Sequence, residues 1–314
     1  MRRSVSKATL FRFCWLLLML PHAAAAQKRY EYREVHMGMP VRIVLYADTD
    51  SLARTAAKAA FERIASLDSD LSDYRPDSEL RRIEAAAGAW VRIKPSTYDV
   101  LARAVGIAEI SGGAFDPTIK PLTHLWREAR RTGTAPRQAA LDSARALVSW
   151  QRLQLDSVNP AARLTTRGMR IDLGGIAKGY IMQEALRTLQ RNGITSALVE
   201  AGGDIVAGSR PPGRPGWRVD VPGADSAFRA RAAALENQAL ATSGASAQFV
   251  EIDGVRYSHV VDPVTGKGLT SSATMHVIAN DGATADALAT TVSIVEPGTA
   301  AAILARFPDV IVSR

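Results

Sequence analysis

The sequence predicts an α+β fold behind an N-terminal signal peptide. Stretches with helical and with strand-like hydrophobic spacing are mixed along the chain, without the strict alternation of a βαβ protein. Short strand patterns are frequent in the second half. Hydrophobic residues make up 47% of the 314 residues and charged residues 22%, as in globular proteins with one large or two modest domains. No internal repeat or low-complexity linker marks a domain boundary.

Residues 1–26 have the pattern of an export signal. A basic start is followed by a short apolar run, Phe13 to Leu20, and then by the small residues Ala23 to Ala26, which suit a signal peptidase. We therefore expect cleavage before Gln27 and a mature domain over residues 27–314, of one or two lobes. The apolar run is too short to span a membrane, and no later stretch reaches the ~18 apolar residues that a membrane anchor needs.

Charge and cysteine content exclude several classes of protein. Without the signal, 35 basic and 31 acidic residues remain and the chain has no dense Lys/Arg run, so we expect no nucleic-acid binding. The only cysteine, Cys14, lies in the signal and lacks the small-residue box of a lipoprotein. A mature chain without cysteine has no disulfide, thiolate nucleophile or cysteine-bound metal, and it suits an oxidising compartment such as the bacterial periplasm.

Periodicity and capping residues place the elements of the first half. Alternating apolar residues predict a strand, apolar residues three and four apart predict helices, and Gly or Pro predicts the turns between them. Gly88 is expected to end one helix and Ser96 to cap the next. In order, we expect a strand over 41–46, helices over 52–67, 78–87 and 96–110, a glycine-flanked acidic turn over 112–118, and a helix over 138–147.

The second half is richer in strands. Asp253-Gly254 predicts a hairpin turn between two of them, and Asn192-Gly193 is expected to end the long helix before them. In order, we expect strands over 152–155, 163–166 and 169–173, a helix over 176–190, strands over 197–200, 217–221, 249–252, 256–261 and 274–279, helices over 283–295 and 299–306, and a final strand over 310–312.

A glycine pair lies where a predicted strand meets a helix, in residues 172–179 (DLGGIAKG). Because glycine has no side chain, a ligand can approach this backbone closely, and the N–H groups at the helix start favour an anion. Lys178 could add a positive charge near a phosphate. The spacing is not that of a Walker loop. The residues alone are equally well explained by a plain strand–turn–helix with a surface lysine.

Asp286 and Thr290 lie four residues apart in a predicted helix, so that a carboxylate and a hydroxyl share one face among alanines. Two such oxygens suit a hard cation such as Mg²⁺. Helix capping by Asp286 and a bond from Thr290 to a backbone carbonyl are simpler alternatives, and the spacing alone favours them.

His259 lies at the end of a predicted strand, beside the polar turn residues of 257–266. A histidine there could act as a base facing a cleft, although a structural histidine is the simpler interpretation of the residue alone. The double glycine in Glu200 to Asp204 is compatible with either a ligand-binding turn or a bend. The other mature histidines, His36, His124 and His276, have no metal-ligand spacing.

Six segments together resemble the FAD:protein FMN transferase family, the ApbE-type flavin transferases. They are residues 71–80 (LSDYRPDSEL), 113–118 (GAFDPT) with 121–122 and 125–126, 172–179, 202–204, 259–266 and 285–290. They occur in the family's order and span nearly the whole mature chain. Six matches in order are far more specific than any one of them.

The resemblance implies an ApbE-like, T-fold-related architecture with mixed, largely antiparallel sheets flanked by helices. It also implies an exported enzyme that binds FAD with Mg²⁺, joins FMN by a phosphoester to a Thr or Ser hydroxyl of an exported acceptor protein, and releases AMP. Two alternatives stay open: an FAD pyrophosphatase that yields FMN and AMP, and a non-enzymatic periplasmic flavin-binding protein.

The resemblance further assigns roles by position. Metal binding falls to Asp286, Thr290 and the carbonyl of Gly175, FAD contacts to Met37, Phe115, Asp116, Asp172 and Lys178, and the role of the catalytic base to His259. Two positions depart from the family pattern. Met39 replaces the usual threonine after Met-Gly, and Ala245-Ser246 stand where an acidic residue commonly follows Thr-Ser-Gly.

Overall fold

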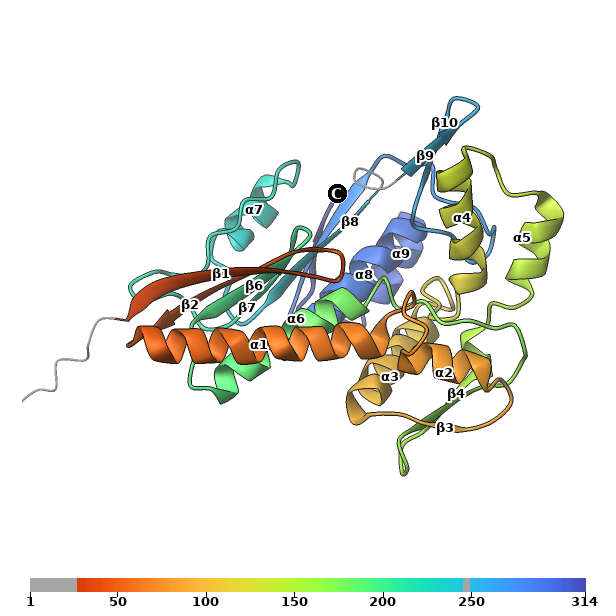
Figure 1. The fold of residues 1–314 in the computed structure, drawn as a ribbon. Helices are drawn as coiled ribbons and strands as arrows, with labels where there is room; N and C mark the ends of the chain where they lie inside the picture. Colours follow the sequence, from red (N-terminus) through yellow and green to blue (C-terminus); the bar gives the residue numbers. More distant parts are fainter. Residues whose placement is uncertain (1–26, 245–248) are drawn as a thin grey trace, which may run out of the picture.

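A computed structural model describes residues 27–244 and 249–314 of the chain (Figure 1). The expected signal peptide and the departure at Ala245-Ser246 lie outside the described residues. The centre is a seven-stranded sheet whose neighbouring strands all pair antiparallel, in the order β1-β2-β6-β7-β8-β11-β12. Its strands are β1 (Lys28–His36), β2 (Met39–Ala47), β6 (Ala197–Ala201), β7 (Asp204–Ala207), β8 (Ala239–Gly244), β11 (Thr274–Ala279) and β12 (Ile311–Ser313).

Helices cover both faces of this sheet, and Figure 1 shows α1 running along it. One face packs against α1 (Asp50–Leu71), α6 (Ala177–Arg191) and α8 (Gly282–Ile294), with α3 (Pro95–Ile110) and α9 (Pro297–Leu304) beside them. Buried alanines of α1, such as Ala56 and Ala60, allow close approach to α6. On the other face, α7 (Ser226–Ala232) packs Phe228 against Trp217 and the sheet. Burial of these apolar surfaces is the main source of the fold's stability.

A second layer of structure lies at the far end of α1 in Figure 1. It contains α4 (Lys120–Thr132), α5 (Gln138–Arg145) and the hairpin of β9 (Phe249–Ile252) and β10 (Val255–Ser258), which share a core around Trp126. Below them lie α2 (Glu79–Ala85), the 3₁₀ turn at Trp150–Arg152 and a three-stranded sheet in the order β3 (Val91–Arg92), β5 (Ala161–Leu164) and β4 (Leu153–Asp156). Among the described residues, β1–β2, β4–β5, β6–β7 and β9–β10 follow one another as hairpins, and the other five strand pairings join segments that lie farther apart in the sequence.

The expected α+β class with largely antiparallel sheets is confirmed. The hairpin turn at Asp253-Gly254 is also confirmed, and both residues have the positive φ, 52° and 74°, that a type I′ turn requires. Ser78 caps α2 through its side chain, and Gly88 follows that helix with φ of 94°. No helix within residues 27–244 and 249–314 combines the length and apolar character needed to cross a membrane.

Two expected strands are wrong. Residues 169–173 run extended but form only one bridge, between Arg170 and Ile119, because the N–H of Ile171 is taken by the Glu84 side chain at 2.9 Å. Likewise, residues 217–221 form a single bridge from Trp217 to Leu235. In both segments the alternating apolar side chains are buried in the hydrophobic core, but the backbone forms no more than one bridge.

The sequence also misplaces one cap and misses four strands and two helices. Ser96 lies inside α3, which begins at Pro95 because proline suits the first helical position. The missed elements are the strands β1, β3, β7 and β8 and the helices α4 and α7. Strand β1 is mostly polar and exposed and depends on pairing with β2, and α4 is so rich in charge that only a narrow stripe around Leu122 and Trp126 is buried.

Candidate active site

A cavity of about 700 Å³ opens between the helical layer of the central sheet and the α4 layer. Its walls come from the β1–β2 turn, the loop after α1, the 114–116 turn, α4, residues 172–178, residues 259–263 and the end of α8. This volume falls in the range of roughly 300–1,000 Å³ that is typical of small-molecule sites. The cavity is therefore the candidate site for a ligand of substantial size.

The cavity gathers the residues to which the sequence assigns a role. Those that line it are Met37, Phe115, Asp116, Asp172, Gly175, Lys178, His259 and Thr290. Asp286 does not line it. It lies one turn before Thr290 on α8, is only 6% exposed, and accepts the N–H of Gly179 at 3.0 Å through Oδ2.

Asp172 is bound on all sides by neighbouring donors. Its Oδ1 accepts the N–H of Gly174 at 2.8 Å, and its Oδ2 accepts the Thr123 hydroxyl at 2.7 Å and an Arg127 N–H at 2.9 Å. The Arg127 guanidinium also pairs with Asp73. Asp172 thereby joins the glycine turn to α4 and, through Arg127, to the loop after α1.

Phe115 and Asp116 form the floor beneath the glycine turn. Phe115 packs so closely that a Cβ at Gly175 would lie 3.2 Å from its ring. Asp116 accepts the N–H of Thr118 at 2.7 Å and the N–H of Trp150 at 2.9 Å, which fixes the 114–118 turn. Burial raises the pKa of Asp116, and the bonds from Thr118 and Trp150 partly oppose this shift.

The glycine turn is less open to an anion than the sequence suggests. Of its N–H groups, that of Gly174 binds Asp172, those of Ile176 and Ala177 bind the Leu173 carbonyl, and that of Gly179 binds Asp286. These donors close the turn and anchor α6 to α8. The anion-binding role expected of the whole helix start is therefore limited by internal hydrogen bonds.

The expected metal ligands lie where α8 meets this turn. A Cβ at Gly175 would lie only 2.9 Å from Thr290 Oγ1, so the space beside the Gly175 backbone exists because that residue is glycine. Asp286 lies on the same face of α8 as Thr290. Carboxylate, hydroxyl and carbonyl oxygens are the hard donors that Mg²⁺ takes, and the residues present fit such an ion.

Two buried carboxylates share one ammonium group behind this wall. Lys178 Nζ lies 2.7 Å from Asp204 Oδ2, and Asp204 is only 1% exposed. Burial raises the pKa of Asp286 to about 7, the Lys178 ammonium opposes this rise, and the nearby Asp204 carboxylate adds to it. The cluster is one positive charge short when both acids are ionised, which is an environment that favours a bound cation.

Met37 occupies the turn between β1 and β2 with φ of 53°, a left-handed conformation that is uncommon for a residue other than glycine. Its N–H donates to Asp68 Oδ2 of α1 at 2.9 Å, which holds the turn over the cavity. Met39 begins β2, and its Sδ would lie 2.9 Å from a Cβ placed at Gly202. The departure at Met39 is thus accommodated by a glycine on the neighbouring hairpin.

His259 directly follows β10 and enters the cavity from the side of α4. The segment after it is well fixed: Val260 donates its N–H to Ser258 Oγ at 3.1 Å, and Trp126 Nε1 donates to the Gly266 carbonyl at 2.8 Å. The segment that carries His259 is therefore anchored by hydrogen bonds to Ser258 and Trp126.

The sequence did not assign a role to several residues of the wall. Tyr74 is exposed, lines the cavity and stacks on the Arg127 guanidinium at 4.9 Å. Arg127 itself and Asp204 were also missed. The matched segments 71–80 and 202–204 contain Tyr74 and Asp204, so sequence patterns could have found these two positions but not their partners. Arg127 lies outside the matched segments.

Comparisons of sequence and of structure with known proteins point to one family. The ApbE family profile matches residues 37–312. An FAD:protein FMN transferase of Treponema pallidum is 32% identical over 304 residues, which cover 91% of this chain and 84% of that protein. The crystal structure of the flavinyl transferase ApbE of Pseudomonas stutzeri, in its apo form, is similar with a TM-score of 0.78 at 26% identity and covers 91% of this chain and 90% of that one. The ApbE protein of Thermotoga maritima is similar with a TM-score of 0.76 at 29% identity, over 91% and 94% of the two chains.

Proposed function

The chain belongs to the ApbE family, and we propose that it uses this cavity to transfer FMN from FAD to a Thr or Ser hydroxyl of an exported acceptor protein. Its curated relatives are FAD:protein FMN transferases, so the family expected from the sequence is confirmed and the chain is an enzyme of that class. The observation that supports these residues as its site is that distant segments line one cavity large enough for a dinucleotide.

The proposed reaction exchanges the phosphoanhydride bond of FAD for a phosphate ester bond to the acceptor. The acceptor's hydroxyl oxygen attacks the phosphorus of the FMN part, the bond from that phosphorus to the bridging oxygen breaks, and AMP leaves with that oxygen. The hydroxyl proton needs an acceptor. His259 lines the cavity, and its neutral ring can take this proton.

Charge in the cavity wall would stabilise the pyrophosphate. Asp286, Thr290 and the Gly175 carbonyl would hold Mg²⁺, which when bound neutralises charge on phosphate oxygens. Lys178 lines the cavity and is held by Asp204, so its ammonium is a fixed positive charge beside the glycine turn. Met37 and Phe115 offer apolar surface for the flavin ring, and Asp116 and Asp172 fix the turns that carry these contacts.

Export is part of the proposal. The signal pattern of residues 1–26, with cleavage before Gln27, and a mature chain without cysteine support a periplasmic or otherwise exported enzyme. Mass spectrometry of the protein recovered from the periplasm of a bacterial host should give a chain that starts at Gln27. A chain that keeps residues 1–26 and stays in the cytoplasm would contradict export.

Incubation with FAD, Mg²⁺ and an exported flavin-accepting domain tests the activity. We expect flavin fluorescence that stays with the acceptor on a denaturing gel, together with one AMP per flavin attached. A Thr→Ala or Ser→Ala change at the acceptor's attachment site should abolish the label. Free FMN and AMP despite a competent acceptor would indicate a pyrophosphatase, and unchanged FAD would indicate a flavin-binding protein.

A further inference from the structure

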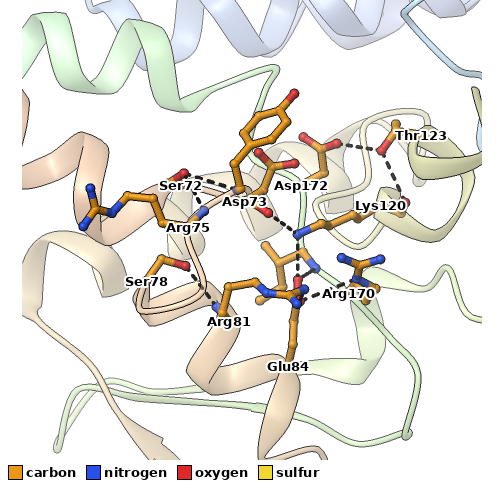
Figure 2. Close-up of polar contacts among 12 residues, drawn as sticks. Ser72, Asp73, Arg75, Ser78, Arg81, Glu84, Lys120, Thr123, Arg170 and Asp172 are labelled. Atoms are coloured by element: carbon orange, nitrogen blue, oxygen red, sulfur yellow. Dashed lines mark hydrogen bonds and ion pairs between the residues drawn. The ribbon is translucent and has the colours of Figure 1, made fainter. Parts of the chain in front are cut away.

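Lys120 is a charged residue at the start of α4 that is only 2% exposed. Its Nζ donates to the carbonyl oxygen of Asp73 at 2.8 Å and lies 3.3 Å from Glu84 Oε1 (Figure 2). Lysine is almost never buried to this degree without a partner of opposite charge. Lys120 does not line the cavity, and neither does Glu84.

Glu84 connects Lys120 to a second wall of the cavity. Its Oε1 also accepts the N–H of Ile171 at 2.9 Å, in the extended segment that leads to Asp172. Its Oε2 lies 2.6 Å from Arg81 Nη1 and 3.6 Å from Arg170 Nε. The Glu84 carboxylate thus binds the backbone of Ile171 and also neutralises the Lys120 ammonium, which in turn binds the backbone of Asp73.

The two segments joined in this way both line the cavity. Residues 72–75 form one part of its wall, and Asp172 with the glycine turn forms another. Ser72 Oγ accepts the N–H groups of Tyr74 and Arg75, each at 3.2 Å, so the loop is internally closed. Figure 2 shows the Lys120 ammonium between Asp73 and Glu84, with Thr123 of the same helix bound to Asp172.

The two walls are therefore tied at two levels. At the cavity, Arg127 pairs with both Asp73 and Asp172. Behind it, Lys120 and Glu84 tie the backbone of Asp73 to that of Ile171. A buried ion pair contributes little net stability, because desolvation offsets the attraction, but it requires a definite geometry.

We propose that Lys120 is a positioning residue that, with Glu84, sets the separation of the 72–75 loop from the Asp172 wall and thereby the affinity for FAD. The inference rests on the proposed function for the identity of the ligand. It assigns no contact between Lys120 and FAD. Its effect passes through the Asp73 carbonyl and the Arg127 bridge.

Three variants separate an effect on the placement of the cavity walls from an effect on the stability of the fold. Lys120→Met keeps the length of the side chain and removes the donor to Asp73, while Glu84 keeps Arg81 and Arg170. Glu84→Gln leaves the Lys120 ammonium buried without its counter-ion, so this variant should show the largest fall in Tm. Lys120→Met combined with Glu84→Gln removes both charges and should regain much of that Tm.

Titration of FAD fluorescence measures the outcome. We expect the Kd for FAD to rise about tenfold or more in Lys120→Met and in the double variant, as for the loss of one charge-assisted hydrogen bond. KM for FAD should rise likewise, with kcat at saturating FAD changed less than about threefold, because a change in ground-state positioning alters KM first. A double variant that regains Tm but still binds FAD weakly would show an effect on the cavity that loss of stability alone does not produce.

Arg63→Met is the matched control. Arg63 of α1 pairs with Glu184 of α6 at 2.6 Å, and neither residue lines the cavity. This variant should lower Tm and leave the Kd unchanged. A wild-type Kd in Lys120→Met, a Kd that also rises in Arg63→Met, or failure of both Lys120 variants to fold would overturn the inference. Absence of FAD binding by the unmodified chain would instead overturn the proposed function, and the inference with it.

Discussion

Asp286, Asp204 and Lys178 bring two carboxylates and one ammonium together behind the wall of the cavity. Asp286 should make stability depend on pH, because burial raises its pKa to about 7 from a usual value of 3.8. In the range between these values the native state holds a proton that the unfolded chain has lost. The contribution of this residue to stability therefore falls as pH rises through that window when no cation is present.

Asp286→Asn tests this residue. In the metal-free protein, only the wild type loses stability through Asp286 as pH rises from 3.8 to about 7. The free energy of unfolding of the Asn variant, relative to that of the wild type, should therefore increase over this range. Urea unfolding at several pH values in EDTA measures the difference. Equal pH profiles for the two proteins would contradict a raised pKa at this site.

The same variant tests metal binding. At pH 8, Mg²⁺ should raise the Tm of the wild type but not of Asp286→Asn, and FMN transfer by the variant should fall by roughly 10²-fold or more, as for the loss of a group that stabilises transition-state charge. Asp281→Asn on the same helix is the control. It changes the cap that binds Thr284 and removes the charge that lies 3.6 Å from Arg103, so it should lower Tm and keep the response to Mg²⁺.

His259 is the second residue whose role can be isolated. His259→Ala should slow FMN transfer by about 10²–10⁴-fold, the usual contribution of a general base, and leave the Kd for FAD nearly unchanged because many other residues line the cavity. The exposed His124 of α4 does not line the cavity, and His124→Ala should transfer FMN normally. Near-normal transfer by His259→Ala, or complete loss of FAD binding, would assign His259 a structural role.

At the scale of elements, the site depends on how closely α6 and α8 cross. Gly179 near the start of α6 and Gly282 at the start of α8 meet backbone to backbone, and a Cβ on either residue would overlap the carbonyl oxygen of the other. The same crossing sets Lys178 beside Asp204 and brings the Asp286 carboxylate to the Gly179 N–H. Glycine at this crossing is therefore a condition for the geometry of the site.

Gly179→Ala should push the two helices apart. We expect a loss of about 1–3 kcal/mol or more in the free energy of unfolding, which is typical of overpacking, and a loss of Mg²⁺-dependent transfer. Gly106→Ala in α3 is a suitable comparison, because a Cβ there meets nothing within 4 Å. It should raise stability by about 0.5–1 kcal/mol, since alanine favours the helix interior. Equal stability of the two variants in urea unfolding would contradict this account.

At the scale of the whole molecule, the cavity joins two layers that have separate cores. The α1, α6 and α8 layer belongs to the core of the central sheet, whereas α4, α5 and the β9–β10 hairpin share the core around Trp126. A ligand that contacts both layers should stabilise them together. The Arg127 bridge and the Lys120–Glu84 pair already connect the walls in the absence of ligand.

Thermal unfolding with ligands tests this coupling. FAD at 100 times its Kd should add about 2.7 kcal/mol to the free energy of unfolding, and all optical probes of unfolding should shift together. FMN or AMP alone contacts fewer residues and should shift Tm less at equal concentration. Separate transitions for the two layers in the presence of saturating FAD would contradict a ligand that bridges them.

Local sequence patterns determined the features that depend on a few neighbouring residues. Spacing of four residues placed Asp286 and Thr290 on one face of α8, and Asp253-Gly254 specified a hairpin turn because those residues accept positive φ. Periodicity located α1, α6, α8 and most strands within a few residues. The order of the six family segments then identified the family, although no single segment did so.

Only the tertiary structure decided which distant charges meet. Lys178 pairs with Asp204, Arg127 joins Asp73 to Asp172, and Lys120 lies buried against Glu84. Nothing local predicts these pairs, because each partner comes from a different element and the contact exists only once both elements have packed. Packing also explains why residues 169–173 do not form the expected strand, since the buried Glu84 carboxylate accepts the Ile171 N–H that a neighbouring strand would have bound.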